Sequence, residues 1–532
     1  MRLIRPLYVS AVLALALASC GTTKKVTAPA ITNIDMAVAK KAPIADAQLK
    51  RWSHLDLLKD SIPGMSVDRA YAEILKDRKS EKVIVGIVDS GVDIEHEDLV
   101  DVIWTNTKEI PGNGIDDDNN GYIDDVHGWN FLGDAIHENM ELVRILKKGD
   151  TKNPDYARAK AEYDKEYAEA MAGKQQIDFI LNADKAIKTE LKKSNYTIED
   201  LKTLTTTNSL VNQVKPRFIQ ILSEISKDEF DKEIQGAKDH YYSQLNYSLN
   251  MEFNGRKIVG DNVDDLSDNK YGNNNVMGPD KTEAKHGTHV AGIVAASRNN
   301  GKGGDGIANN VAIMAVRAVP DGDEYDKDIA LGIRYAVDNG AKVINGSFGK
   351  YYSTHPQWVL DALKYAADKD VLVVIAAGND SYDLDVTNKY PNDSYNNDPE
   401  FSNNVIIIGA LNTPYNINLL ADFSNYGKKN VDVFSPGMKI YSTTPNNTYE
   451  YLQGTSMASP NVAGVAALIR SYYPKLSAVQ VKQILMESGL QPKLDVIVGG
   501  DKDDVKPFSE VSKSGRMVNA YNALIMADKL SK

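Results

Sequence analysis

The chain has 532 residues, of which 42% are hydrophobic and 25% charged, and these proportions are typical of a soluble globular protein with a large core. Its formal net charge of −12 argues against a nucleic acid as the main partner. The only cysteine is Cys20, so no disulfide can form within the chain.

Residues 1–19 predict a bacterial export signal. Arg2 and Arg5 precede a mostly apolar run over residues 7–18, which is too short to span a bilayer. The run ends in the letters LASC, which resemble the cleavage site of bacterial lipoproteins. That resemblance implies a lipid on the sulfur of Cys20, with an ordinary export signal and an unmodified cysteine as the alternative. Because the next residue, Gly21, is not acidic, the expected location is the outer membrane of the cell envelope.

The segment of residues 20–50 is rich in Thr, Lys, Ala and Pro, and it is expected to act as a tether. Only about 30 residues separate Cys20 from the first globular positions, too few for an inhibitory propeptide domain, so we do not expect autoprocessing. No other stretch is long and apolar enough to be a membrane helix.

From residue 51 onward, short apolar runs alternate with helical patterns. The runs cover residues 83–88, 311–319, 343–344, 371–376, 405–409 and 431–434. Helices are predicted over residues 66–76, 329–337, 359–366, 477–487 and 518–529. Continuous apolar runs are typical of parallel strands covered on both faces. The chain is therefore predicted to have an α/β fold, a three-layer arrangement around a mostly parallel central sheet.

Residues 132–250 interrupt this alternation. They are rich in Lys, Glu, Asp, Ala and Tyr, and they show helical stripes without strand patterns, for example over residues 156–171 and 218–225. This segment is predicted to be a helical insertion. One interpretation is a solvent-exposed helical elaboration without a role in the functional site. The other is a wall that controls substrate access, or an arm that docks a partner, beside that site. The main domain would then comprise residues 51–131 and 251–530.

Three short motifs carry the side chains of an activated-serine nucleophile. A carboxylate, Asp89, ends the first apolar run in IVDSGVD, and an imidazole, His286, begins HGTHVAG. A hydroxyl, Ser456, lies in GTSMASP just before an apolar helical segment, where the positive end of the helix dipole stabilises negative charge. Each residue alone would more often be structural, as a helix cap or a packed histidine. Together, in this order, the three motifs are highly specific for an activated-serine nucleophile.

The order Asp, His, Ser and the three motifs resemble the subtilisin-like serine proteases, called subtilases. The resemblance implies a subtilisin-like serine endopeptidase with Asp89, His286 and Ser456 as its triad and Asn379 as the side-chain donor to the oxyanion. It also implies that two segments flank the primary specificity pocket and pair with the substrate backbone, namely Ser347, Phe348 and Gly349, and Ala376, Ala377 and Gly378. Phe348 and the Ala-Ala-Gly wall predict a broad, apolar pocket. Asn461 departs from the family, which usually has a histidine there.

Two acidic segments predict structural calcium sites. DDDNNGYIDD resembles the start of a calcium loop, which makes Asp116, Asp118, Asn120 and Asp124 candidate ligands, with Asp125 as a substitute for the usual final glutamate. An acidic surface turn is the alternative. Asp98 and Asn300 match side-chain ligands of a calcium site in subtilisins, although Lys302 is unusual in that loop.

The expected partners are protein or peptide substrates, and a membrane reached through the lipid. Two other functions remain open from the sequence. An acyl transferase such as a peptide ligase would use the same triad, and a binding protein could act mainly through the helical insertion.

Overall fold

A computed structural model describes residues 34, 37–40 and 42–532. The predicted export signal and Cys20 lie outside these residues. The centre of the fold is a parallel sheet of seven strands in the order β2-β3-β1-β4-β5-β6-β7. The strands are β1 (Val83–Asp89), β2 (Gly128–Asn130), β3 (Val311–Arg317), β4 (Val343–Gly346), β5 (Leu372–Ala376), β6 (Val405–Leu411) and β7 (Val433–Pro436). The predicted α/β fold with a parallel central sheet is confirmed.

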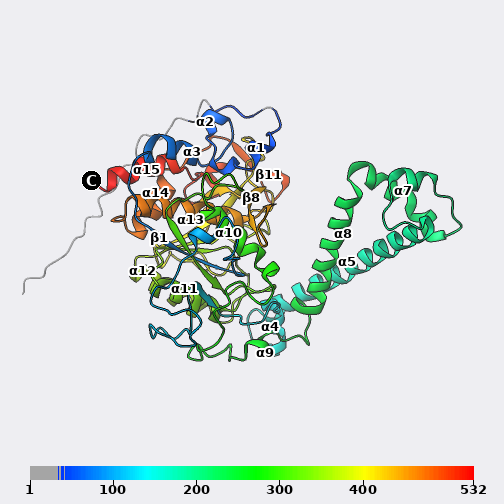
Figure 1. Ribbon diagram of the computed structural model, residues 1–532, viewed down its shortest axis with the longest axis horizontal. Coiled ribbons are helices and arrows are strands. Elements are labelled where there is room, and N and C mark those ends of the chain that lie inside the picture. The colour runs from blue at the N-terminus through cyan, green and yellow to red at the C-terminus, as the bar shows by residue number, and fades with distance from the viewer. Residues whose placement is uncertain (1–33, 35–36, 41) are drawn as a thin grey trace, which may run out of the picture.

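Connections between parallel strands place helices on both faces of the sheet, and nearly every strand residue is buried as a result. Helices α10 (Lys285–Ala295) and α13 (Thr455–Tyr472) pack together and against the sheet, whereas α11 (Asp326–Asp338) and α12 (Pro356–Asp368) form a second pair. Figure 1 shows these pairs around the sheet. The carboxyl ends of β1, β4 and β5 meet at one edge, since these strands are neighbours.

Further helices complete the main domain. They are α1 (Asp46–Leu49), α2 (Leu57–Asp60), α3 (Val67–Ala70), α9 (Arg256–Val259), α14 (Ala478–Glu487) and α15 (Ala520–Leu530). Two hairpins, β8 (Ile440–Thr444) with β9 (Thr448–Leu452) and β10 (Asp495–Val498) with β11 (Asp501–Pro507), were not predicted. Their outer strands carry alternating polar residues without a continuous apolar run, which is why the pattern did not reveal them.

Two boundaries differ from the prediction. Ile34 is buried in the main core and α1 is helical, so part of the segment expected to be a tether is folded. Ser66 does not cap a helix over residues 66–76 with its side chain. It has a left-handed φ of 58°, its hydroxyl accepts a hydrogen bond from Asn519, and the helix continues as a π-helix from Tyr71.

Residues 132–250, between β2 and α9, are largely helical, and most of them project from the main domain as an arm (Figure 1). It contains α4 (Glu141–Lys148), α5 (Tyr156–Leu191), α6 (Ile198–Thr203), α7 (Ser209–Glu224) and α8 (Lys227–Ser243). Its far end has a hydrophobic core of its own, formed around Ile187, Leu201 and Phe218. Its base is packed on the main domain, where Arg158 of α5 donates a 2.9 Å hydrogen bond to the carbonyl of Tyr351. Among the described residues, none of the helices could cross a bilayer.

Candidate active site

Ser456 is the second residue of α13, whose N-cap is Gly454. The first backbone N–H groups of an α-helix have no acceptor within the helix, so the N–H of Ser456 is available to a ligand. The Ser456 hydroxyl donates to the carbonyl of Ser347 at 3.1 Å. In this arrangement it is therefore bonded to the wall of the site rather than to His286.

Asp89 and His286 form the hydrogen bond that the motifs predict. Asp89 is 1% exposed at the end of β1, and His286 is in the first turn of α10. The Nδ1 atom of His286 lies 2.7 Å from Oδ1 of Asp89, which also accepts from the N–H of Ser90 at 2.7 Å. Burial by itself lowers the pKa of His286, but the charge of Asp89 and its hydrogen bond outweigh burial and raise this pKa above 6.5.

Gly287 allows this contact to form. A Cβ atom at this position would collide with the carbonyl oxygen of Gly91, so only glycine lets α10 approach the end of β1 so closely. His289, the second histidine of the motif, is buried, and its Nε2 lies 3.1 Å from the carbonyls of Ile440 and Glu450. Burial lowers the pKa of His289 to about 3, which keeps it neutral.

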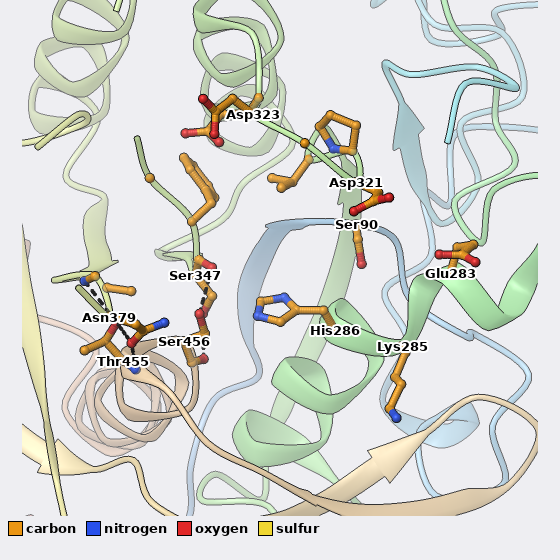
Figure 2. Close-up of a pocket in the computed structure, with 18 of the residues that line it drawn as sticks. Ser90, Glu283, Lys285, His286, Asp321, Asp323, Ser347, Asn379, Thr455 and Ser456 are labelled. Carbon is orange, nitrogen blue, oxygen red and sulfur yellow. Dashed lines mark hydrogen bonds between the residues drawn. The ribbon is translucent and has the colours of Figure 1, made fainter. Parts of the chain in front are cut away.

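His286 and Ser456 line one cavity of about 850 Å³. Figure 2 shows the His286 ring beside Ser456, with Asn379 on the other side of the serine. Asn379 accepts hydrogen bonds at its Oδ1 atom from the N–H and the hydroxyl of Thr455, at 2.8 and 2.9 Å. Because the carbonyl end of this amide is held, its N–H₂ end is the one left for a substrate oxygen.

The two predicted wall segments follow neighbouring strands, β4 and β5. Ser347, Phe348 and Gly349 line the cavity, and so do Ala376 and Gly378. Ala377 does not reach the cavity, because it is fully buried and its carbonyl accepts a hydrogen bond from Asn425.

Other residues line the cavity without having been predicted. These are Asp321, Asp323, Glu324, Tyr351, Asp380 and Lys389, among others. They come from loops after β3, β4 and β5 and carry no motif, so only the folded chain brings them together. The wall of the cavity therefore includes a buried lysine and several carboxylates beside the predicted segments, and the broad, apolar pocket stays a prediction.

The predicted calcium loop brings only part of its candidates together. Carboxylate oxygens of Asp118, Asp125 and Glu109 lie within 4.8 Å of one another, and Glu109 was missed because it precedes the loop motif. Asp116 accepts from the N–H groups of Asn120 and Gly121, at 3.0 and 2.8 Å.

Asp124 is turned away from that cluster. Its two oxygens accept from the backbone N–H groups of residues 112–114, at 2.8 to 3.2 Å. The prediction of Asp124 as a ligand of the same ion is therefore not supported by its position. The remaining three carboxylates are hard oxygen donors, of the type that Ca²⁺ prefers, and they fit such an ion.

Asp98 and Asn300 are in contact, with a 2.5 Å hydrogen bond from Nδ2 of Asn300 to Oδ1 of Asp98. Oδ2 of Asp98 is buried and has no hydrogen-bond partner among the described residues, so a cation would fit there. Lys302 does not compete for this oxygen, since its ammonium pairs with Glu97 at 2.6 Å.

The chain is similar to several known proteins. The family model described as Subtilase family matches residues 80–500. The thermophilic serine proteinase of Bacillus sp. strain AK1 is 33% identical over 60% of this chain and 73% of its own length. Thermitase of Thermoactinomyces vulgaris is 42% identical over 40% of this chain and 68% of its own. A solved protease from Pseudoalteromonas arctica matches 46% of this chain and 70% of its own, with 31% identity and a TM-score of 0.37.

Proposed function

The chain belongs to the subtilase family of serine proteases, and from this premise we propose that Asp89, His286 and Ser456 form its catalytic triad. The protein is a subtilisin-like serine endopeptidase, and its proposed mechanism passes through an acyl-enzyme on Ser456. The observation that carries this proposal is the 2.7 Å contact between Asp89 and His286, whose ring lines the same cavity as Ser456.

The proposed reaction begins when a substrate displaces the Ser456 hydroxyl from the Ser347 carbonyl. Asp89 accepts a hydrogen bond from Nδ1–H of His286, which leaves Nε2 as the free base. His286 takes the serine proton as the hydroxyl attacks the peptide carbonyl, and it then returns this proton to the leaving amine. Water attacks the resulting ester by the same route in reverse and regenerates Ser456.

The negative charge of the tetrahedral intermediate has two proposed donors. These are the N–H of Ser456 in the first turn of α13 and the amide of Asn379, whose orientation Thr455 fixes. The dipole of α13 adds to their effect, because its positive end lies at the same place.

Labelling with a fluorophosphonate probe tests the nucleophile. Wild type should form a covalent adduct at Ser456, and Ser456→Ala should abolish both the adduct and peptide hydrolysis. Ser531→Ala, which changes an exposed serine at the end of α15, is the matched control and should behave as wild type. Hydrolysis that persists in Ser456→Ala would overturn the proposal.

Calcium is proposed as a structural ion. Asp118, Asp125 and Glu109 would hold one ion, and Asp98 with Asn300 would contribute to a second. The ion would neutralise the repulsion between these carboxylates and so stabilise the loops. Asp98 supports this proposal in particular, because burial raises its pKa and an adjacent cation would offset that cost.

Export, a lipid on Cys20 and attachment to the outer membrane are proposed from the sequence alone. Radiolabelled palmitate should be incorporated into wild type and not into Cys20→Ser when both are expressed in a bacterium that processes lipoproteins. Equal incorporation into both proteins would contradict the proposal.

The arm provides a second candidate function, as a docking site for a protein partner or a bound substrate protein. The observation that favours it is the separate hydrophobic core at the far end, which lets that end stay folded away from the catalytic domain (Figure 1). Removing the far end should abolish binding of such a partner and leave cleavage of short peptides intact.

A further inference from the structure

We propose that Lys389 makes this protease select an acidic side chain, Glu or Asp, on the residue whose carbonyl Ser456 attacks. The inference rests on the proposed function of Ser456, and it concerns the substrate class of the same site.

Lys389 is placed on the wall that the substrate residue would touch. It is 3% exposed and lines the same cavity as Ser456. Its ammonium donates to the carbonyl of Phe348 at 3.1 Å, and a Cβ atom at Gly349 would collide with it. The charge therefore lies directly against the segment of residues 347–349.

Three other lysines are buried in the described part of the chain, and each has carboxylate partners. Lys327 pairs with Asp261 at 2.5 Å, Lys350 with Glu141 at 2.9 Å, and Lys482 with Asp393 at 3.3 Å. This is the usual condition for burying a charge in a protein, since an unpaired buried ion is strongly destabilising.

Lys389 is the exception among them. Within the residues that the structure describes, no carboxylate oxygen lies within 4.0 Å of its ammonium, which has the Phe348 carbonyl as its only protein partner. Burial lowers the pKa of Lys389 to about 8, against the opposing effect of the more distant Glu324 and Asp380. An unpaired ammonium in the wall of a substrate cavity can be compensated by a carboxylate that the substrate brings.

Glu324 supplies only part of that compensation. It lines the same cavity, and its Oε1 atom is buried without a hydrogen-bond partner among the described residues. Burial and the neighbouring Asp323 raise the pKa of Glu324 to about 7, against the lowering effect of Lys350, so its carboxyl is partly protonated near neutral pH. A protonated Glu324 donates a hydrogen bond and so also favours an incoming carboxylate.

The test compares peptides that differ only in the residue before the cleaved bond, which is Glu, Gln, Leu or Lys. Wild type at pH 7 should show a kcat/KM at least tenfold higher for Glu than for Gln, because the two side chains have the same shape and differ in charge. Lys389→Met should remove this ratio and keep or raise the rate for Leu. Lys389→Glu should prefer Lys over Glu. Lys369→Met, an exposed lysine after α12, is the control and should keep the wild-type ratio.

Two outcomes overturn the inference: a wild-type Glu-to-Gln ratio of one or less, or a Lys389→Met variant that keeps the wild-type ratio. Fluorophosphonate labelling reports whether Lys389→Met is folded. If Lys389→Met is not labelled, the inference is judged from the Glu-to-Gln ratio of kcat/KM in wild type and from the same ratio in the Lys389→Gln variant. Peptide hydrolysis that survives in Ser456→Ala would instead show that the proposed function is wrong, so the two failures are distinguishable.

Discussion

Replacing Asp89 by Asn tests how the carboxylate acts on His286. Oδ1 of Asp89 accepts from both the Ser90 N–H and the His286 Nδ1–H, whereas Oδ2 is buried and has no partner among the described residues. An asparagine can keep its carbonyl oxygen at the Oδ1 position and satisfy both donors. The tautomer of His286 is then retained, and the variant removes mainly the charge.

The size of the effect follows from the distance. Two unit charges about 4 Å apart attract each other by about 4 kcal/mol at an effective dielectric constant of about 20. His286 is 38% exposed, so solvent screening reduces this value, and about 2–4 kcal/mol is expected. Because the imidazolium forms only as the reaction proceeds, the loss falls on kcat and amounts to roughly 30- to 1,000-fold.

The assay is the pH dependence of kcat/KM for a short peptide. His286 acts as a base in its neutral form, and Asp89 raises its pKa above 6.5, so wild-type activity should be lost on the acidic side as the pH falls through that raised value. In Asp89→Asn only the effect of burial on the pKa of His286 remains. The acidic limb of the kcat/KM profile should therefore move below pH 6.5, and the maximal kcat/KM should fall. A variant within threefold of wild type, or an unmoved acidic limb, would refute this reasoning.

Four further predictions follow from the site, the calcium loop and the arm. Asn379→Ala should lower kcat by about 10²–10³-fold with little change in KM, the usual cost of one oxyanion donor, and steady-state kinetics would contradict this if only KM changed. Chelation should lower the melting temperature by about 2–4 °C if calcium was present at about 100 times its Kd, and the decrease should be smaller in Glu109→Gln, which loses one of the two proposed ions; calorimetry without any calcium effect on wild type would exclude both ions. The Glu-to-Gln preference should decline as the pH rises through about 8, because Lys389 loses its charge there while Glu324 is ionised, and a ratio constant from about pH 6 to 9 would contradict it. Replacing residues 174–240 by a short linker should leave peptide kcat/KM within about threefold, because α4 and the contact of Arg158 with Tyr351 remain, and a complete loss of activity would show that the far end supports the site.

The sequence was informative wherever one residue type is required at one position. The strands were found because burial on both faces demands continuous apolar runs, and the β1 run located Asp89 at its carboxyl end. The pair of Asp89 and His286 was predictable because each side chain belongs to a short motif with little freedom. Gly287 belongs to the same motif, but the requirement for glycine at this position is explained only by the packing of α10 on β1.

Residues whose role depends on distant contacts were not predictable. Lys389 lies in a loop with no pattern, and its importance comes from what surrounds its ammonium rather than from its neighbours in the chain. Glu109 was missed for the same reason, since the folding of the loop back on itself brings it to Asp118. Asp124 shows the opposite error, because a ligand position in a linear motif was assigned to a side chain that binds backbone N–H groups.

The length of α5 sets a scale for any protein held at the far end of the arm. This helix has 36 residues, which corresponds to about 54 Å at 1.5 Å per residue. Its first turns contact Tyr351 and Tyr352, next to the wall of the cavity, so the helix begins beside the active site and its length measures how far the arm extends from it. A protein bound at the other end would need about 15 extended residues to reach Ser456. Only long, unfolded segments of such a protein would therefore reach the catalytic serine.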